Sequence, residues 1–367
     1  MAEALDWIRL SLVPGLGITG FWRLIDHFQS PAAVFRASRQ EILRVKGIRE
    51  NQVSGVLAGQ ETMARAQREL CSLADIGAAA VTFEDPRYPA LLKKLPDPPP
   101  VLYVRGRLEL LGVPAVAVVG SRAATAYGRR TAYALSRNLA DSSLTVISGL
   151  ALGIDTEAHA GALSAKGSTV AVLGCGLDVV YPRQNGRLFR DIAEHGLLVS
   201  EYPLGTPPEG FRFPARNRII AGLSLGVVVV EAAQRSGSLI TAQIALDTGR
   251  EVFAVPGQVD SCKSEGTHWL LKQGAKLVQS IQDIVEELGM QAPAVGSRGE
   301  PTAVKDLPGL EPEAKDLLAK IDSYPIPRES LLETAGLAPG RFSELLLILE
   351  LEGLVEILAG DQVRKRV

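Results

Sequence analysis

The chain has 367 residues, of which 46% are hydrophobic and 22% charged, and its formal net charge is −2. These values are typical of a folded protein of two or three domains, and they exclude a protein that meets a polyanion with basic charge over its whole surface. The N-terminal residues mix acids with apolar side chains, and the sequence has no basic leader and no apolar run of membrane length. We therefore expect a cytoplasmic protein with no membrane partner.

The three cysteines, Cys71, Cys175 and Cys262, are far apart in the sequence and form no CxxC pair. This spacing favours reduced thiols in a reducing compartment, without disulfides and without a zinc site. We interpret all three as small buried side chains, and we expect no metal site.

Residues 1–75 are predicted to form short helices, with turns at Gly15, Gly17 and Gly47. The pattern resembles SAM-like or helix-hairpin-helix domains, in which the N–H groups of the turn can bind a phosphate. A small helical module that packs or binds another protein is an equally good interpretation.

Residues 76–288 are predicted to form an α/β domain with an extended Rossmann-like, doubly wound sheet. Runs that are apolar throughout alternate with helix-length segments, as a parallel sheet covered on both faces requires. The predicted strands are 115–120, 144–149, 168–174, 197–201, 225–233 and 250–257, with a further strand at 101–106.

The last segment is predicted to be a winged helix. Residues 289–308 are rich in Gly, Pro and Ala and indicate a linker, and residues 309–367 contain three helical patterns and a terminal hairpin. The third helix contains one arginine and three glutamates, so we expect it to contact protein rather than to read a DNA groove.

Several predicted strands end in the same way, with glycine beside hydroxyl side chains. Ligands of open α/β sheets lie at these carboxyl ends, and such loops can cradle an anion. The residues concerned are Gly120, Ser121, Arg122, Ser148, Gly149, Ser236, Gly237 and Ser238. No GxGxxG follows the strand at 115–120, so we expect no dinucleotide cofactor.

Residues 211–220, FRFPARNRII, combine three arginines with two phenylalanines. Cations that follow phosphates and rings that stack on bases are what a single-stranded nucleic acid needs from a protein. The candidates are Phe213, Arg216, Asn217 and Arg218. Arg216 and Arg218 are about 200° apart on a helix, so we expect one of them to pair internally, with Glu201 or Glu231 as the partner. The alternative interpretation is that the two phenylalanine rings pack in the hydrophobic core.

Asp155 and His159 are four residues apart on a predicted helix, a spacing that acid-base catalysis could use. No nucleophile or third partner stands at a useful spacing, and Glu231 by itself decides nothing. We expect a structural role for the Asp155–His159 pair and no enzyme activity.

Seven ordered blocks together resemble the DNA-processing protein A (DprA or Smf) family. They are GSRAATAYG, SGLALGIDTEAHAGAL, GSTVAVLGCGLDVVYP, SEYPLG, FPARNRIIAGLS, SGSLITAQIALDTGREVFAVPG and EGTHWLLKQGAKLV. The resemblance implies a dimeric protein that binds single-stranded DNA during natural transformation, protects it, and loads RecA onto strands covered by single-strand-binding protein. It places the family's arginine on Arg122 and its FPxRNR motif on Phe213, Arg216, Asn217 and Arg218.

Two positions depart from the family's pattern. Leu152 stands where many relatives have a basic residue, and Arg183 is the candidate that compensates for it; His268 replaces the usual Asn. The competing hypothesis is a nucleotide-binding phosphoribohydrolase of the lysine-decarboxylase-like fold, but Gln243 stands where such enzymes need a carboxylate. A winged-helix transcription regulator is disfavoured by the acidic third helix.

Overall fold

The computed structural model describes residues 2–165, 168–290, 311–321, 325–358 and 360–365. The chain folds into two compact units, Met1–Pro293 and Ala294–Val367. Among the described residues, no helix is both long enough and apolar enough to cross a membrane.

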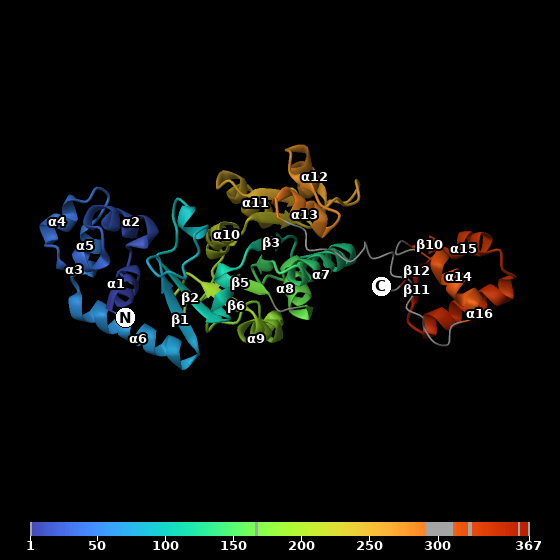
Figure 1. The fold of residues 1–367 in the computed structure, drawn as a ribbon, viewed down its shortest axis with the longest axis horizontal. Helices are drawn as coiled ribbons and strands as arrows, with labels where there is room; N and C mark the ends of the chain where they lie inside the picture. The colour runs from blue at the N-terminus through green and yellow to red at the C-terminus, as the bar shows by residue number, and fades with distance from the viewer. Residues whose placement is uncertain (1, 166–167, 291–310, 322–324, 359, 366–367) are drawn as a thin grey trace. The chain divides into compact units, whose positions relative to one another are not determined.

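The first unit begins with six helices, drawn in blue in Figure 1. They are α1 Ala2–Ser11, α2 Gly17–Phe28, α3 Pro31–Arg36, α4 Arg39–Arg44, α5 Glu50–Leu57 and α6 Gly59–Asp75. The predicted glycine turns are present: Gly15 and Gly47 have φ values of 72° and 87°, which L side chains rarely adopt. Trp7 and Phe21 pack in one apolar cluster with Tyr103 of the sheet, so these helices share a core with the α/β region.

A nine-stranded sheet forms the centre of this unit. Its strands are β1 Ala78–Thr82, β2 Val101–Gly106, β3 Ala115–Val119, β4 Thr145–Ser148, β5 Thr169–Leu173, β6 Leu197–Ser200, β7 Gly226–Val229, β8 Glu251–Ala254 and β9 Lys276–Leu277. The order is β1-β2-β6-β5-β4-β3-β7-β8-β9. The β1–β2 and β2–β6 pairs are antiparallel, and the other pairs are parallel. The predicted extended Rossmann-like fold is confirmed; β1 and β9 at the two edges were not predicted.

Helices cover both faces of the sheet (Figure 1). The helices are α7 Ala126–Asp141, α8 Ile154–Ser164, α9 Gly186–His195, α10 Arg212–Leu223, α11 Gly237–Asp247, α12 Glu265–Lys272 and α13 Ile281–Glu287, with short 3-10 turns η1 Leu92–Lys94, η2 Leu108–Gly112 and η3 Arg183–Asn185. Ala117 of β3 packs in the cluster with α10 and α11, whereas Val118 packs with α7 and α8. Both faces of β3 are therefore buried, which explains its uninterrupted apolar run.

The strand order reverses at β3. The chain continues from β3 to β4 on one side, and β7 pairs with β3 on the other side. The loops after these strands diverge around a crevice at their carboxyl ends, which is where open α/β sheets bind ligands.

The second unit is a winged helix, as predicted. Its elements are α14 Pro312–Lys320, β10 Ile326–Pro327, α15 Arg328–Ala335, α16 Pro339–Leu351, β11 Val355–Leu358 and β12 Gln362–Lys365. The three strands pair in the order β10-β12-β11, and Phe342, Leu345 and Leu349 of α16 are buried in the core. Most of the predicted linker, from residue 291 on, lies outside the described residues.

The cysteines differ from the interpretation based on sequence. Cys175 is buried, but Cys71 and Cys262 are exposed. The interpretation of all three as buried side chains is therefore wrong for two of them, because scattered cysteines carry no sequence signal for burial.

Candidate functional site

A groove of ≈ 570 Å³ opens at the carboxyl ends of β3 and β7, and α10 forms one of its walls. Nine of the predicted site residues line it: Gly120, Ser121, Arg122, Phe213, Arg216, Asn217, Ser236, Gly237 and Ser238. Residues more than one hundred positions apart in the sequence thus meet at the point where the strand order reverses.

The loop after β3 is held in place by backbone contacts and presents Arg122. Ser121 donates its N–H to the carbonyl of Glu231 at 2.8 Å and accepts the N–H of Ile154 at 3.2 Å. Gly153 has a φ of 81°, and a Cβ there would overlap the Ser121 carbonyl. The side chain of Arg122 is exposed, and no carboxylate of the described residues forms an ion pair with it. Its charge is therefore available to a ligand.

The N-terminus of α11 forms the opposite part of the groove. Ser236 caps this helix: its Oγ accepts the N–H of Ser238 at 3.4 Å and lies 2.8 Å from the Ser238 Oγ. Asn217 of α10 donates to the carbonyl of Gly237 at 3.4 Å, which ties the two walls together. Arg235 is exposed and lines the same groove. Hydroxyls, a guanidinium and the start of a helix give this end the chemistry of a phosphate site.

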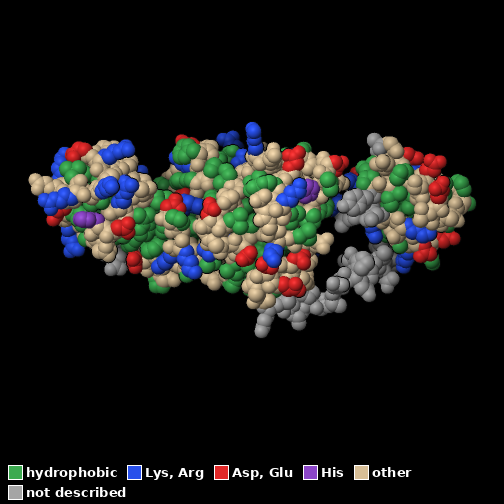
Figure 2. All heavy atoms as spheres, turned by 90° about the horizontal axis from the view of Figure 1, so that it is seen from above, with side chains coloured by type: hydrophobic (Ala, Val, Ile, Leu, Met, Phe, Trp, Pro, Cys, Tyr) green, Lys and Arg blue, Asp and Glu red, His purple; other side chains and the backbone are tan. Residues whose placement is uncertain are grey.

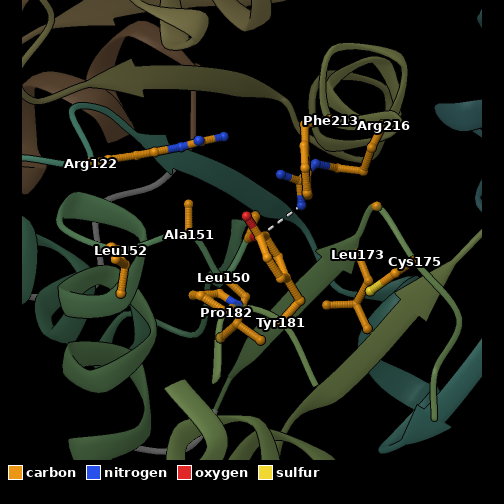
Figure 3. A pocket seen from close by; sticks show the side chains of 12 residues that line it. Arg122, Leu150, Ala151, Leu152, Leu173, Cys175, Tyr181, Pro182, Phe213 and Arg216 are labelled. Carbon is orange, nitrogen blue, oxygen red and sulfur yellow. Dashed lines mark hydrogen bonds between the residues drawn. The ribbon is translucent and has the colours of Figure 1, made fainter. Parts of the chain in front are cut away.

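A second, smaller pocket of ≈ 70 Å³ lies on the other side of Phe213. Figure 3 shows its mostly apolar lining and Arg122 extending toward Phe213. The two pockets share Arg122, Ala151, Phe213 and Arg216. The Phe213 ring stacks on Tyr181 with centroids 5.3 Å apart, and the Arg122 guanidinium lies 5.6 Å from the Phe213 centroid. A ring with a cation beside it therefore lines both the groove, to which Ser and Arg side chains contribute, and the small apolar pocket.

Arg216 is a buried cation in the wall between the pockets, with 4% of its surface exposed. It donates to the carbonyls of Gly149, at 2.8 Å, and of Val172. A Cβ at Gly149 would overlap the guanidinium, so the backbone approaches it closely. Burial lowers the pKa of Arg216, and the nearby Asp155 carboxylate opposes this effect. Arg216 thus lends positive charge to both pockets while it holds the loop after β4.

Arg218 points elsewhere. It forms ion pairs with Glu201 and, at 3.2 Å, with Asp97, and it is 8% exposed. The predicted internal pair with Glu201 is present and belongs to Arg218. Because its charge is already matched and it lines neither pocket, Arg218 is not placed in the candidate interface, in contrast to the expectation from sequence.

Three other predicted residues have different surroundings. Ser148 is fully buried and donates to the carbonyl of Val118 at 2.7 Å, so it supports the sheet. Gly149 lines the small pocket. Arg183 is exposed and lines neither pocket, although it directly follows Pro182, which lines the small one.

Leu152 and His268, which depart from the family pattern, lie in different parts of the structure. Leu152 is 37% exposed and lines the small pocket. His268 lies on α12, where its Nε2 is 3.1 Å from the carbonyl of Gly257, and it lines neither pocket.

The residues considered for catalysis have structural partners. Asp155 accepts the N–H groups of Gly149 and Ala151 at 3.1 and 3.3 Å. The Nδ1 of His159 contacts the Thr169 hydroxyl at 2.7 Å, so the two residues have different partners among the described residues. Burial lowers the pKa of His159 to about 3, which keeps the ring neutral. Glu231 accepts the N–H of Thr125 at 2.9 Å and bonds to its hydroxyl, at the start of α7.

Sequence reasoning did not identify Tyr181 and Arg235. Tyr181 lies in the loop after β5, and the rule that ligands gather at strand ends applied to this loop as well. Arg235 immediately precedes the predicted Ser-Gly-Ser cradle. The presence of an aromatic residue and an arginine in these strand-end loops is the sequence feature that could have identified them.

The winged-helix unit has a different charge pattern. Arg341, the one basic residue of α16, forms ion pairs with Glu311, Glu313 and Glu344. These carboxylates raise its pKa and leave no unmatched positive charge on the helix that would read a DNA groove. The expectation that α16 contacts protein remains a prediction.

Comparison with known proteins identifies the fold and the family. The family described as DNA recombination-mediator protein A matches residues 79–289, and the DprA winged helix domain matches residues 301–361. The protein Smf of a Synechocystis species is 36% identical over 100% of this chain and 99% of its own length.

Two solved structures are similar. The crystal structure of DNA processing protein A from Streptococcus pneumoniae is 38% identical, with a TM-score of 0.69 over 77% of this chain and 97% of that chain. The structure of DNA processing protein A from Helicobacter pylori, described for its single-stranded DNA binding mode, is 33% identical, with a TM-score of 0.53 over 57% of this chain and 95% of that chain. A relative that matches along its whole length, together with both domain matches, shows that this chain belongs to the DprA/Smf family of DNA-processing proteins.

Proposed function

We propose that this protein binds single-stranded DNA at the groove and the small pocket. The observation that carries the proposal is the position of Phe213, with Arg122 beside it, between a groove suited to phosphates and an apolar pocket suited to a base. Single-strand binding needs cations along the backbone and rings for stacking, without readout of sequence. The described binding of single-stranded DNA by the Helicobacter pylori relative supports this proposal.

We further propose that the bound strand is an intermediate of natural transformation, that the protein protects it, and that the protein helps to load RecA onto strands covered by single-strand-binding protein. The family's description as a recombination mediator supports such a role. In this proposal the protein acts by binding and handing over DNA in the cytoplasm, without turnover.

The enzymatic alternative, a phosphoribohydrolase, finds little support in the geometry. Gln243 is exposed on α11 and donates to Asp247 at 2.8 Å, and Glu231 is occupied by Thr125. The test is competition of oligo-dT, duplex DNA and nucleoside monophosphates for the full-length protein, with released base measured in parallel. Preferential displacement by oligo-dT supports the proposal. Release of free base that depends on Glu231 contradicts it.

We propose that the protein is a homodimer that uses the β9 edge of the sheet. Trp269 of α12 and Leu277 of β9 are each 47% exposed, and β9 is the last strand of the sheet among the described residues. Large apolar side chains at an unpaired edge favour association. We expect Trp269→Glu with Leu277→Glu to give a monomer in light scattering, whereas Leu246→Glu, which changes another exposed leucine, leaves the mass unchanged. A wild-type monomer contradicts the proposal.

Leu152 provides a gain-of-function prediction. Its side chain is exposed at the small pocket, so lysine fits there and adds a cation near the proposed strand. We expect Leu152→Lys to bind oligo-dT more tightly and to increase the slope of log affinity against log salt by about 0.7. Leu246→Lys is the matched control. Unchanged affinity and slope in Leu152→Lys would place the strand away from this loop.

A further inference from the structure

The N-terminal helices contain a second basic surface, separate from the groove. A wide, open hollow of ≈ 590 Å³ is lined by Arg23, Asp26, His27, Arg44, Val45, Lys46 and Gly47. Figure 2 shows Lys and Arg side chains gathered over this end of the first unit. Residues 20–50 contain six basic and three acidic residues, a local charge of +3 in a chain whose net charge is −2. We call this surface the N-terminal basic hollow.

The turn between α4 and α5 builds the hollow. Gly47 has a φ of 87°, and its carbonyl accepts a long bond of 3.4 Å from Nη1 of Arg23 on α2. A Cβ at Gly47 would overlap the Arg23 guanidinium. The close approach of the turn to α2 therefore brings Arg23 beside Arg44 and Lys46, which lie in and after α4.

These cations are poorly matched by acids. Arg39, nearby in the sequence, pairs with Glu50, whereas Arg23 and Lys46 form no ion pair with any described residue. Arg44 interacts with Glu41 only electrostatically, and its charge helps to lower the pKa of that carboxyl. Asp26 is the one acid among the lining residues, against three cations and His27. Arg23, Arg44 and Lys46 are all exposed to solvent, so the hollow attracts anions.

We propose that the N-terminal basic hollow binds the phosphate backbone of nucleic acid that extends beyond the groove. This inference rests on the proposed function, and it adds a second contact site to it. The lining contains no Phe, Tyr or Trp side chain, in contrast to the surroundings of Phe213. The hollow therefore recognises phosphates alone, and its contribution is purely electrostatic.

The test uses the full-length protein and labelled oligo-dT of about 6, 12, 25 and 50 nucleotides, because one binding fold covers about 4–16 nucleotides. We expect Arg44→Gln with Lys46→Gln to bind the shortest probe normally. With the longest probe, the slope of log affinity against log salt should shrink by about 1.4, at about 0.7 per phosphate. Between about 50 and 200 mM salt, wild-type affinity should then fall about sevenfold more than that of the variant.

Arg68→Gln with Arg187→Gln is the matched control, since both residues are exposed, lie outside the hollow and the groove, and carry the same total charge. A duplex of about 50 base pairs distinguishes the source of the phosphates: a larger loss for the duplex assigns the hollow to double-stranded DNA, and a larger loss for oligo-dT assigns it to the strand in the groove.

The outcomes separate this inference from the proposed function. The inference is overturned if the Arg44→Gln, Lys46→Gln variant binds every probe with the affinity and salt slope of wild type. It is also overturned if the variant loses as much affinity for the shortest probe as for the longest. If instead Arg122→Ala binds the shortest probe normally, the groove is not the primary site and the proposed function fails. Equal losses in the hollow variant and the control would show general electrostatics and would also overturn the inference.

Discussion

Phe213→Ala is expected to weaken oligo-dT binding by about 1–3 kcal/mol while leaving the salt dependence of binding nearly unchanged. The ring lies between the two pockets, stacked on Tyr181, and alanine removes a stacking surface but no charge. Phe211→Ala is the matched control, because Phe211 belongs to the same segment, is 69% exposed and lines neither pocket. The measurement is fluorescence anisotropy at several salt concentrations.

Arg122→Ala should change both the affinity and the salt dependence of binding. Arg122 is exposed at the groove without an ion pair to any described carboxylate, so its loss should reduce affinity and shrink the salt slope by about 0.7, the value for one phosphate. Arg130→Ala, which changes an exposed arginine of α7 outside the groove, should keep the affinity and the salt slope of wild type. Normal binding by both Phe213→Ala and Arg122→Ala would show that the strand binds elsewhere.

Arg216→Ala is expected to lower the free energy of unfolding by about 3–5 kcal/mol. The substitution leaves the carbonyls of Gly149 and Val172 without their donor, and it removes the cation whose charge favours ionisation of the buried Asp155. Urea unfolding at constant pH measures this change. Binding should be measured below the melting temperature, so that loss of the fold is not mistaken for loss of a contact.

Arg130→Ala again serves as the control, and it should change stability by no more than about 0.5 kcal/mol, as surface substitutions usually do. If Arg216→Ala unfolds like wild type but binds oligo-dT poorly, then Arg216 contacts DNA directly and its hydrogen bonds to the loop contribute little to stability.

The sequence by itself determined the fold class. The apolar runs of β3, β4, β5, β6, β7 and β8 are continuous and regularly separated by helices, as a parallel sheet covered on both faces requires. The edges could not be predicted in the same way: β1 is rich in alanine and β9 has two residues, so neither carries a pattern of its own.

The sequence also placed Arg122 and the Ser236–Ser238 cradle at the carboxyl ends of predicted strands, where open α/β sheets bind ligands. Helical spacing showed that Arg216 and Arg218 diverge, but not which of them would pair internally. Only the tertiary structure decided this, because Glu201 and Asp97 approach Arg218 from distant parts of the chain, while Arg216 reaches two backbone carbonyls under the pockets. The partners of a buried charge are set by packing between remote segments, and local sequence patterns do not contain that information.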